Sequence, residues 1–261
     1  MNHLLLDYLP AYILGGSLAT VTLLLIGIHR GFKRAGWLDR DRKRAIGTIA
    51  ALLLIWFLAA LGPAWLGLYR GTASGFPTIQ YGIVIPLLIA LTLSLRWRLL
   101  RSVIDAIPQT WLAGIQFFRT MGLIFLLLYA AGRLPGVFAL PAGIGDMAVG
   151  LLAPIVGLTY ARRPQAVAGW LRAWNLLGIA DLIVALTTGF LSSPSPLQRF
   201  AFDHPNELIS AFPLVMIPVF LVPLAILLHL ASLKNLSQVG GEAWLLSTRF
   251  QYRRSLGNSP V

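Results

Sequence analysis

The chain has 261 residues, of which 57% are hydrophobic and only 11% are charged, and its mean hydropathy is +0.76. Because soluble domains carry about 25% charged residues, this composition argues against a soluble globular protein and predicts an all-α, polytopic membrane protein. The absence of cysteine excludes disulfides, thiolate metal sites and cysteine-based redox chemistry.

Seven apolar segments are predicted to form a bundle of seven transmembrane helices. A helix needs about 20 residues to cross about 30 Å of hydrocarbon, and the segments that meet this requirement are, in chain order, 11–28, 46–68, 79–95, 111–131, 137–160, 167–191 and 211–233. The connecting loops are short, so the predicted organisation is a transmembrane domain over residues 1–233 and a cytoplasmic C-terminal tail over residues 234–261.

The basic residues are distributed unevenly between the two sides of these segments. Seventeen of the 21 lysines and arginines follow the first, third, fifth and seventh segments, whereas Arg70, Arg133 and Arg199 lie on the other side. Loops rich in lysine and arginine stay in the cytoplasm, which predicts an outside N-terminus, a cytoplasmic C-terminus and a multi-pass location in the cell inner (plasma) membrane. The same distribution explains the net charge of +12 without a nucleic-acid partner, since the predicted partner is the lipid bilayer.

Three charged residues interrupt the apolar segments: Arg119 in the fourth, Asp146 in the fifth and Asp181 in the sixth. A charge near the middle of the bilayer costs about 2.5–3.5 kcal/mol, so such residues face the bundle interior and find partners. At 1.5 Å per residue, all three lie about 12–14 Å from the nearest membrane boundary. Because consecutive helices tend to be neighbours, we predict an Arg119–Asp146–Asp181 cluster.

The fifth segment carries a stripe of small residues that contains Asp146. Its members, spaced three and four apart, are Ala139, Ala142, Gly143, Asp146, Gly150, Ala153 and Gly157. The bulky residues expected on the opposite face are Phe138, Ile144, Leu151 and Ile155. Small residues let membrane helices approach closely, so Asp146 is predicted to face protein rather than lipid.

Two amides complete the predicted substrate- or ion-binding set. Gln116 precedes Arg119 by three residues on nearly the same helix face, and Asn175 lies in the sixth segment with Asp181. One arginine facing two ionised aspartates leaves a net charge of −1, which suits a proton, a sodium ion or an organic cation. The same three charges also fit a purely structural lock that joins three helices.

No cofactor, metal site or catalytic residue is predicted. His29 and His229 are expected near the cytoplasmic interface, where an interaction with a helix C-terminus explains both. The seven-helix topology resembles that of microbial rhodopsins, but the segment 211–233 contains no lysine, so retinal is not expected.

Three functions remain open at this point. The first is a small permease or a proton- or cation-coupled carrier that uses the charged cluster. The second is a membrane receptor, sensor or assembly partner, in which the cluster is a lock and the tail docks a protein. The third is a membrane-embedded enzyme acting on a lipid-like substrate, for which the sequence offers only His29, His229 and Asp105 at headgroup depth.

Overall fold

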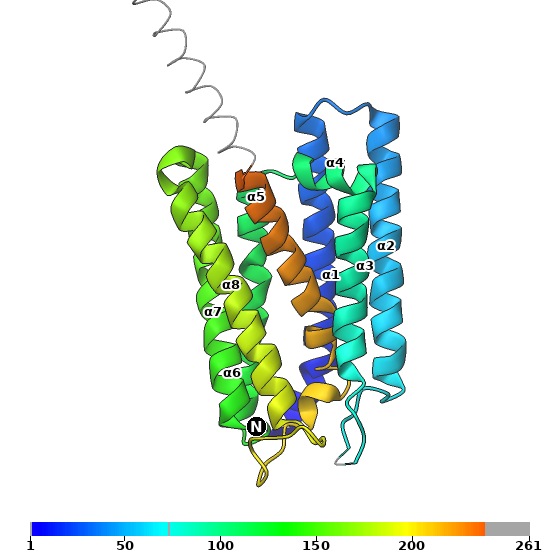
Figure 1. The fold of residues 1–261 in the computed structure, drawn as a ribbon, viewed down its shortest axis with the longest axis vertical. Helices are drawn as coiled ribbons and strands as arrows, with labels where there is room; N and C mark the ends of the chain where they lie inside the picture. The colour runs from blue at the N-terminus through cyan, green and yellow to red at the C-terminus, as the bar shows by residue number, and fades with distance from the viewer. Residues whose placement is uncertain (1, 73, 238–261) are drawn as a thin grey trace, which may run out of the picture.

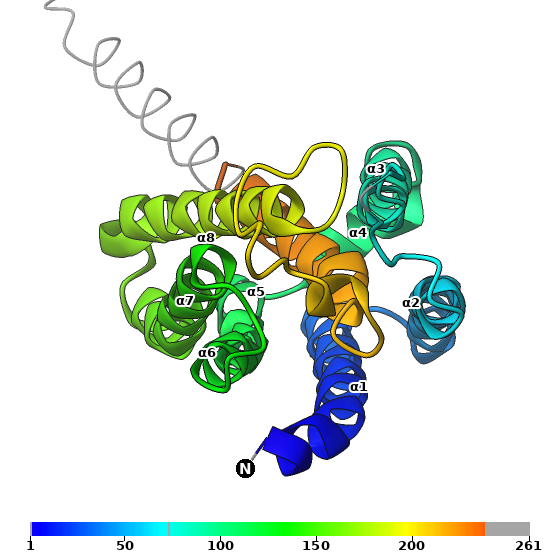
Figure 2. The ribbon, with the colours of Figure 1, turned by 90° about the horizontal axis from the view of Figure 1, so that it is seen from below.

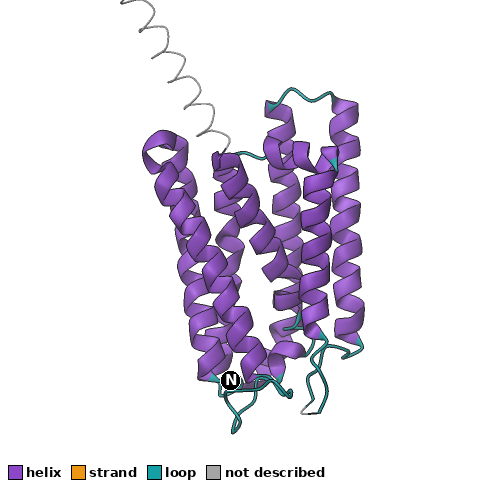
Figure 3. Ribbon diagram, viewed as in Figure 1, coloured by secondary structure: helices purple, strands orange, loops and turns teal. Residues whose placement is uncertain are grey.

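The computed structural model describes residues 2–72 and 74–237, and within them the chain is helical, without a β-strand (Figures 1 and 3). In chain order, the helices are α1 (Asn2–Arg34), α2 (Asp39–Trp65), α3 (Ile79–Arg96), α4 (Arg98–Ala106), α5 (Gln109–Gly114), the 3₁₀ helix η1 (Ile115–Gly122), α6 (Leu123–Ala130), α7 (Gly136–Arg162) and α8 (Pro164–Ser192). A short 3₁₀ helix, η2 (Leu208–Ser210), and a π-helical turn, η3 (Ile217–Leu221), follow; η3 opens the last helix, Ile217–Ser237.

Seven helices of the described chain are long and apolar enough to cross a membrane, which confirms the predicted all-α class and the number of apolar helices. Several ends differ from the prediction. Residues 211–215 form a bend and turns rather than helix, because Pro213 and Pro218 lack the amide hydrogen that helical bonding requires. At the other end, the last helix reaches Ser237 rather than residue 233.

The region after α3, expected to be a loop, contains the helix α4. This helix is amphipathic: Val103 is buried, whereas Arg98 and Arg101 are exposed. It packs on α1 and α3 near the end of the bundle at which α3 ends (Figure 1). An apolar stripe on so short a segment becomes helical because burial of that stripe, rather than helix propensity, stabilises it.

The turn between α7 and α8 consists of Arg163 alone. Pro164 occupies the first turn of α8, where its missing amide hydrogen costs nothing. The residue before a proline is disfavoured in the helical conformation, and Arg163, with φ −142° and ψ 65°, lies outside it. The two helices therefore run antiparallel and pack along much of their length (Figure 1).

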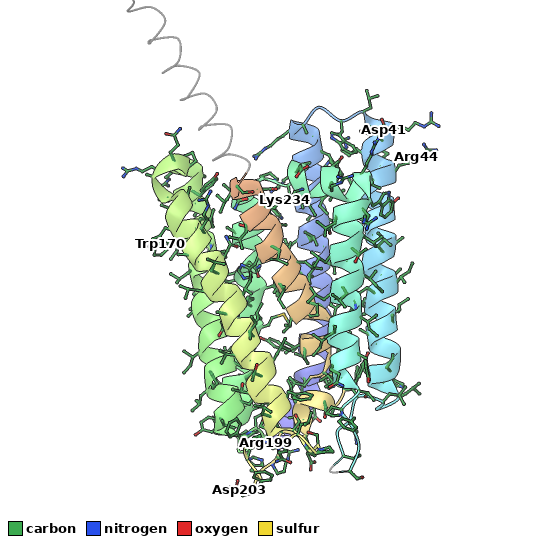
Figure 4. The ribbon with its side chains drawn as sticks, in the orientation of Figure 1. Asp41, Arg44, Trp170, Arg199, Asp203 and Lys234 are labelled. Atoms are coloured by element: carbon green, nitrogen blue, oxygen red, sulfur yellow. The ribbon has the colours of Figure 1, made fainter. Side chains whose placement is uncertain are left out.

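Charged residues separate the two ends of the bundle (Figure 4). We call the end that carries Asp41, Arg44 and Lys234 the basic end. Most of the lysines and arginines lie in the segments found there, which are the connection between α1 and α2, helix α4 and the turn between α7 and α8. The other end, which carries Arg199 and Asp203, is called the opposite end. The grouping of the basic residues at one end agrees with the alternation of helix direction that the sequence predicted.

The last helix lies in the middle of the bundle (Figure 2). In the most apolar part of this helix 72% of the residues are buried, whereas none is buried in the corresponding part of α3. Phe220 of this helix packs edge-on against Trp56 and Phe57 of α2, and further residues contact α3, η1 and α8. The last helix therefore contacts α2 and α3 as well as η1 and α8, and it places side chains between these helices.

Large apolar side chains cover the outer faces of the helices. Exposed examples from α2, α3, α7 and α8 are Leu54, Ile55, Ile85, Ile89, Ile144, Ile155, Leu177 and Ile183. Soluble monomers rarely expose apolar patches larger than a few hundred Å². This surface suits contact with lipid acyl chains and, with the seven apolar helices, suggests a multi-pass membrane protein.

Candidate functional site

The fourth apolar helix is interrupted at Arg119. The sequence predicted one continuous helix over residues 111–131, but α5, η1 and α6 divide it, and Arg119 lies in the 3₁₀ segment η1. The backbone of η1 lies against Gly150 of α7, where an added Cβ would come within 2.7 Å of the Thr120 amide nitrogen. The absence of a side chain at Gly150 therefore lets η1 and α7 approach this closely.

The predicted cluster of Arg119, Asp146 and Asp181 is confirmed. Arg119 Nε donates to Asp146 Oδ1 at 2.7 Å, and Arg119 Nη2 lies 2.7 Å from the same oxygen. Nη2 also donates to Asp181 Oδ2, and Nη1 donates to the carbonyl oxygen of Gly178 at 3.1 Å. All three nitrogens of the guanidinium are thus engaged, by groups from α7 and α8.

His229 belongs to the same cluster, and the prediction that it lies near the helix end is wrong. Its side chain is completely buried, with Nε2 3.5 Å from Arg119 Nη1. The last helix continues to Ser237, which places His229 about 12 Å from that end of the helix. The predicted helix ended at residue 233, one turn too early, so His229 was expected too close to the helix end.

The hydrogen bonds of His229 fix its tautomer. A guanidinium nitrogen only donates, so Nε2 of His229 accepts. The ring hydrogen is then on Nδ1, which lies 2.9 Å from Asn175 Oδ1 and donates to it. The imidazole is therefore neutral and adds no charge to the cluster.

A chain of side-chain hydrogen bonds continues from Asn175 toward the basic end. Asn175 Nδ2 donates to Ser232 Oγ at 2.9 Å, and Gln109 Nε2 donates to the same hydroxyl at 2.5 Å. Asn175, His229 and Ser232 have no exposed surface. The predicted candidate Asn175 thus joins the cluster indirectly, through His229, whereas the sequence argument did not identify Gln109 or Ser232.

Gln116 lies apart from the charges. Its Nε2 donates to the carbonyl oxygen of Ala225 on the last helix at 3.1 Å, and its buried Oε1 has no partner among the described groups. None of its hydrogen bonds reaches Arg119, Asp146 or Asp181. In the 3₁₀ segment η1, residues three apart still share one face, but from that face Gln116 reaches the last helix whereas Arg119 reaches α7 and α8.

Glycines make room for the charged groups. A Cβ added at Gly145 of α7 would collide with the carboxylate of Asp181, and one added at Gly178 of α8 would meet the His229 ring and lie 3.3 Å from Arg119 Nη1. The small-residue stripe of α7 is buried as predicted, and Ile144, Leu151 and Ile155 are exposed. Phe138 is buried instead of exposed, since it packs edge-on against Phe125 of α6.

With both aspartates ionised, the cluster carries one excess negative charge in a region with little water contact. The side chain of Arg119 is 1% exposed, that of Asp146 is 10% exposed and that of Asp181 is 16% exposed. One arginine and two ionised aspartates sum to −1, and the neutral His229 does not change this. A cation or a proton would neutralise the remaining charge.

A cavity of about 350 Å³ connects the opposite end of the bundle with Asp146. At its outer part it is lined by Tyr69, Gly71 and Pro77 before α3 and by Ser193 and Ser210 after α8. Its walls consist mainly of apolar residues from α3, α8 and the last helix. We call it the Asp146 cavity; a separate space of about 20 Å³ beside Arg119 and Asp146 has room for about one water molecule.

A second large cavity lies at the basic end. It measures about 470 Å³ and is lined by residues that include Gln109, Asp105 and Tyr160. Gln109 is the first member of the hydrogen-bonded chain that leads through Ser232, Asn175 and His229 to Arg119. Polar contacts therefore connect the two cavities through the charged cluster.

Within residues 2–72 and 74–237, no group of three or more histidine, aspartate or glutamate side chains is placed to hold a metal ion. His29, His229 and Asp105, the side chains considered for an enzyme at headgroup depth, do not lie at one depth, because His229 is buried inside the bundle. The predicted docking tail lies almost entirely outside the described residues.

Comparison with known proteins gives a family but no activity. No curated protein and no solved structure shows a significant match to the chain. The model of one family, described as a domain of unknown function (DUF8737), matches residues 76–237. This segment includes Arg119, Asp146, Asn175, Asp181 and His229, and it covers more than half of the 261 residues. The chain therefore belongs to the DUF8737 family.

Proposed function

We propose that this protein is a small permease, or a proton- or cation-coupled carrier, that uses the Arg119–Asp146–Asp181 cluster. The observation that carries the proposal is the position of Asp146, which pairs with the buried Arg119 and also lines the cavity from the opposite end. A purely structural ion pair gains nothing from contact with a cavity. Ionisable residues inside membrane helices mark ion and substrate paths in many transporters.

The charge balance supports a role in cation or proton binding. Arg119 offsets one of the two carboxylates, so a bound cation would remove the remaining charge in a region where uncompensated charge is costly. Binding and release at this place would change the attraction between α7, α8 and η1. This provides a physical link between ion binding and helix rearrangement.

The two cavities support a path across the bundle. The Asp146 cavity begins at the opposite end, whereas the second cavity is lined by Gln109 at the basic end. The side chains of Asn175, His229 and Ser232, which lie between them, are completely buried. This is the arrangement expected of a carrier that opens to one side at a time.

The proposed orientation follows from charge. We place the N-terminus outside and the basic end in the cytoplasm of a cell inner membrane, because loops rich in lysine and arginine remain inside. In this orientation the Asp146 cavity faces the exterior, the transmembrane domain includes the last helix up to Ser237, and the tail that follows is cytoplasmic. The partners are the bilayer and a small cationic ligand.

The test uses the full-length chain in liposomes adsorbed to a solid-supported membrane. A jump in Na⁺ concentration at constant ionic strength, or a jump in pH, should produce a transient current that empty liposomes lack. Asp146→Asn and Asp181→Asn should each abolish this current. Both variants should still fold, because each leaves Arg119 with one carboxylate.

Asp41→Asn is the matched control, since Asp41 is exposed at the start of α2, and it should retain the wild-type current. The absence of a current from the wild type with both Na⁺ and pH jumps would contradict the proposal. Wild-type currents from both cluster variants would also contradict it.

One observation favours a second candidate, the structural lock. Every nitrogen of Arg119 has a partner, as expected for a group whose role is to hold α7, α8 and η1 together. In this case the protein would be a receptor or an assembly partner, and neutral residues of similar size could replace the three charges without loss of function.

A further inference from the structure

We propose that the Asp146 cavity binds a hydrophobic amine in its protonated form, with the ammonium group against Asp146 and the apolar part along the cavity walls. This inference rests on the carrier function proposed above, because it names the class of molecule that the same site would take. The apolar walls of the cavity and the position of the charges support it.

The cavity walls select an apolar molecule. Between the outer part and Asp146 they include Ile83, Phe125, Phe138, Leu182, Ile217 and Val222. The volume of about 350 Å³ lies in the range of small-molecule sites, about 300–1,000 Å³. A small, strongly hydrated ion would leave most of this surface without a partner, whereas a hydrophobic molecule would bury it.

The charges select a cation. Asp146 is the only charged residue among the described residues that line this cavity, and Arg119 does not line it. A molecule in the cavity therefore meets the carboxylate, while the guanidinium lies behind it. Since the cluster has a net charge of −1, a monovalent ammonium group would bring the total to zero, whereas an anion would add to the excess.

Aromatic rings line the cavity between Asp146 and the opposite end. Phe125 and Phe138 line it together with Asp146, and their ring centroids lie 5.2 Å apart at 67°. Phe138 precedes Asp146 by eight residues of α7, about 12 Å along the helix axis, so these rings would pack on the apolar body of the ligand. A calcium ion prefers several oxygen ligands, and Asp146 provides the only carboxylate among the described residues that line the cavity.

The outer part of the cavity tolerates a polar end of the ligand. Tyr69, Gln80, Ser193 and Ser210 line it there, near the loops of the opposite end. A lipid acyl chain would fill the apolar part but would leave the negative charge uncompensated. An amine with an apolar body and a modest polar substituent matches all three parts of the cavity.

The experiment compares three probes of nearly equal size: 4-phenylbutylamine, which is a cation at neutral pH, 4-phenylbutanol, which is neutral, and 4-phenylbutyrate, which is an anion. Binding to the full-length protein in lipid nanodiscs is measured by calorimetry. The wild type should bind the amine at least about tenfold more tightly than the alcohol, which corresponds to about 1.4 kcal/mol, and should bind the anion least.

Two variants separate the charge from the cavity. Asp146→Asn should remove the preference for the amine while it retains binding of the alcohol, which also shows that the variant is folded. Ala185→Phe, which places a ring in the cavity, should weaken binding of both probes. Val184→Phe is its matched control, since Val184 is the neighbouring residue of α8, is 46% exposed and does not line the cavity.

Each outcome decides between the proposals. Equal binding of amine and alcohol by the wild type, or an amine preference that survives Asp146→Asn, would overturn the amine site. Bound phospholipid that only Ala185→Phe displaces, without any amine preference, would identify an acyl-chain groove and also overturn it. An amine preference without transient currents would support the amine site and overturn the carrier function. Transient currents without an amine preference would support the carrier function and overturn the amine site.

Discussion

Arg119 is the residue on which the interior of the bundle depends. Its nitrogens reach Asp146, Asp181 and the carbonyl oxygen of Gly178, and its side chain is 1% exposed. Removing one partner of a buried ion pair costs about 3–5 kcal/mol, because it leaves a charge without compensation, whereas replacing all partners by neutral groups costs far less. This asymmetry separates the energetic role of the cluster from its proposed function.

Arg119→Gln alone should lower the free energy of unfolding by about 3–5 kcal/mol, since two neighbouring carboxylates lose their shared partner. The triple variant Arg119→Gln, Asp146→Asn, Asp181→Asn should recover most of that loss, because no uncompensated charge remains. Denaturant titration of the protein in mixed micelles measures both effects.

The triple variant also distinguishes a carrier from a structural lock. A carrier should lose its transient currents even when stability is restored, because no carboxylate remains to bind the ion. If the stable triple variant kept wild-type currents, the cluster would be a lock. An arginine variant as stable as the wild type would contradict the energetic argument itself.

At the scale of elements, α7 is the helix that brings the cluster together. It packs against α5, η1, α6 and α8, and its buried face consists largely of alanine and glycine. Small residues at a membrane helix interface allow backbones to approach closely and gain dispersion contacts. The close approach of η1 to Gly150 is one result, and the position of Arg119 beside Asp146 is another.

Ala153→Leu should destabilise the bundle, because Ala153 is completely buried and three added carbon atoms have no space there. Overpacking of this kind costs about 1–3 kcal/mol. Ala148→Leu is the matched control on the same helix, since Ala148 is exposed and the larger side chain would meet lipid. The apparent melting temperature in detergent should fall for the first variant and remain near the wild-type value for the second.

At the scale of the whole molecule, the basic end and the opposite end differ in charge. Most lysines and arginines of the described chain lie in segments of the basic end, whereas Arg70, Arg133 and Arg199 lie at the opposite end. Figure 4 labels Arg44 and Lys234 at the first end and Arg199 at the second. This separation underlies the proposed orientation, in which the Asp146 cavity faces outward. Inverting the molecule would reverse the side from which a ligand enters.

The orientation can be measured directly, because the sequence contains no cysteine and a single introduced cysteine is unambiguous. Asp203→Cys should react with a membrane-impermeant maleimide on intact cells. Asp41→Cys should react only after the membrane is opened. The reverse pattern would place the N-terminus in the cytoplasm and would contradict the proposed entry of ligand from outside.

The sequence determined the features that depend on composition and on position along single helices. The seven apolar segments, the grouping of basic residues and the common depth of Arg119, Asp146 and Asp181 all follow from hydropathy, charge and a rise of 1.5 Å per residue. The burial of the α7 stripe could also be predicted, since small residues three and four apart share one face. Charges inside apolar helices must pair, so their contact was expected as well.

Tertiary packing decided the rest. Gln116 bonds to the last helix and Arg119 to α7 and α8, because these helices pack on different sides of η1, which the sequence of η1 does not predict. His229 joins the cluster because the last helix occupies the centre of the bundle and extends further than its apolar residues indicated. The Asp146 cavity is formed by residues far apart in the sequence, on α3, α8 and the last helix, so only the mutual arrangement of these helices could place a carboxylate within it.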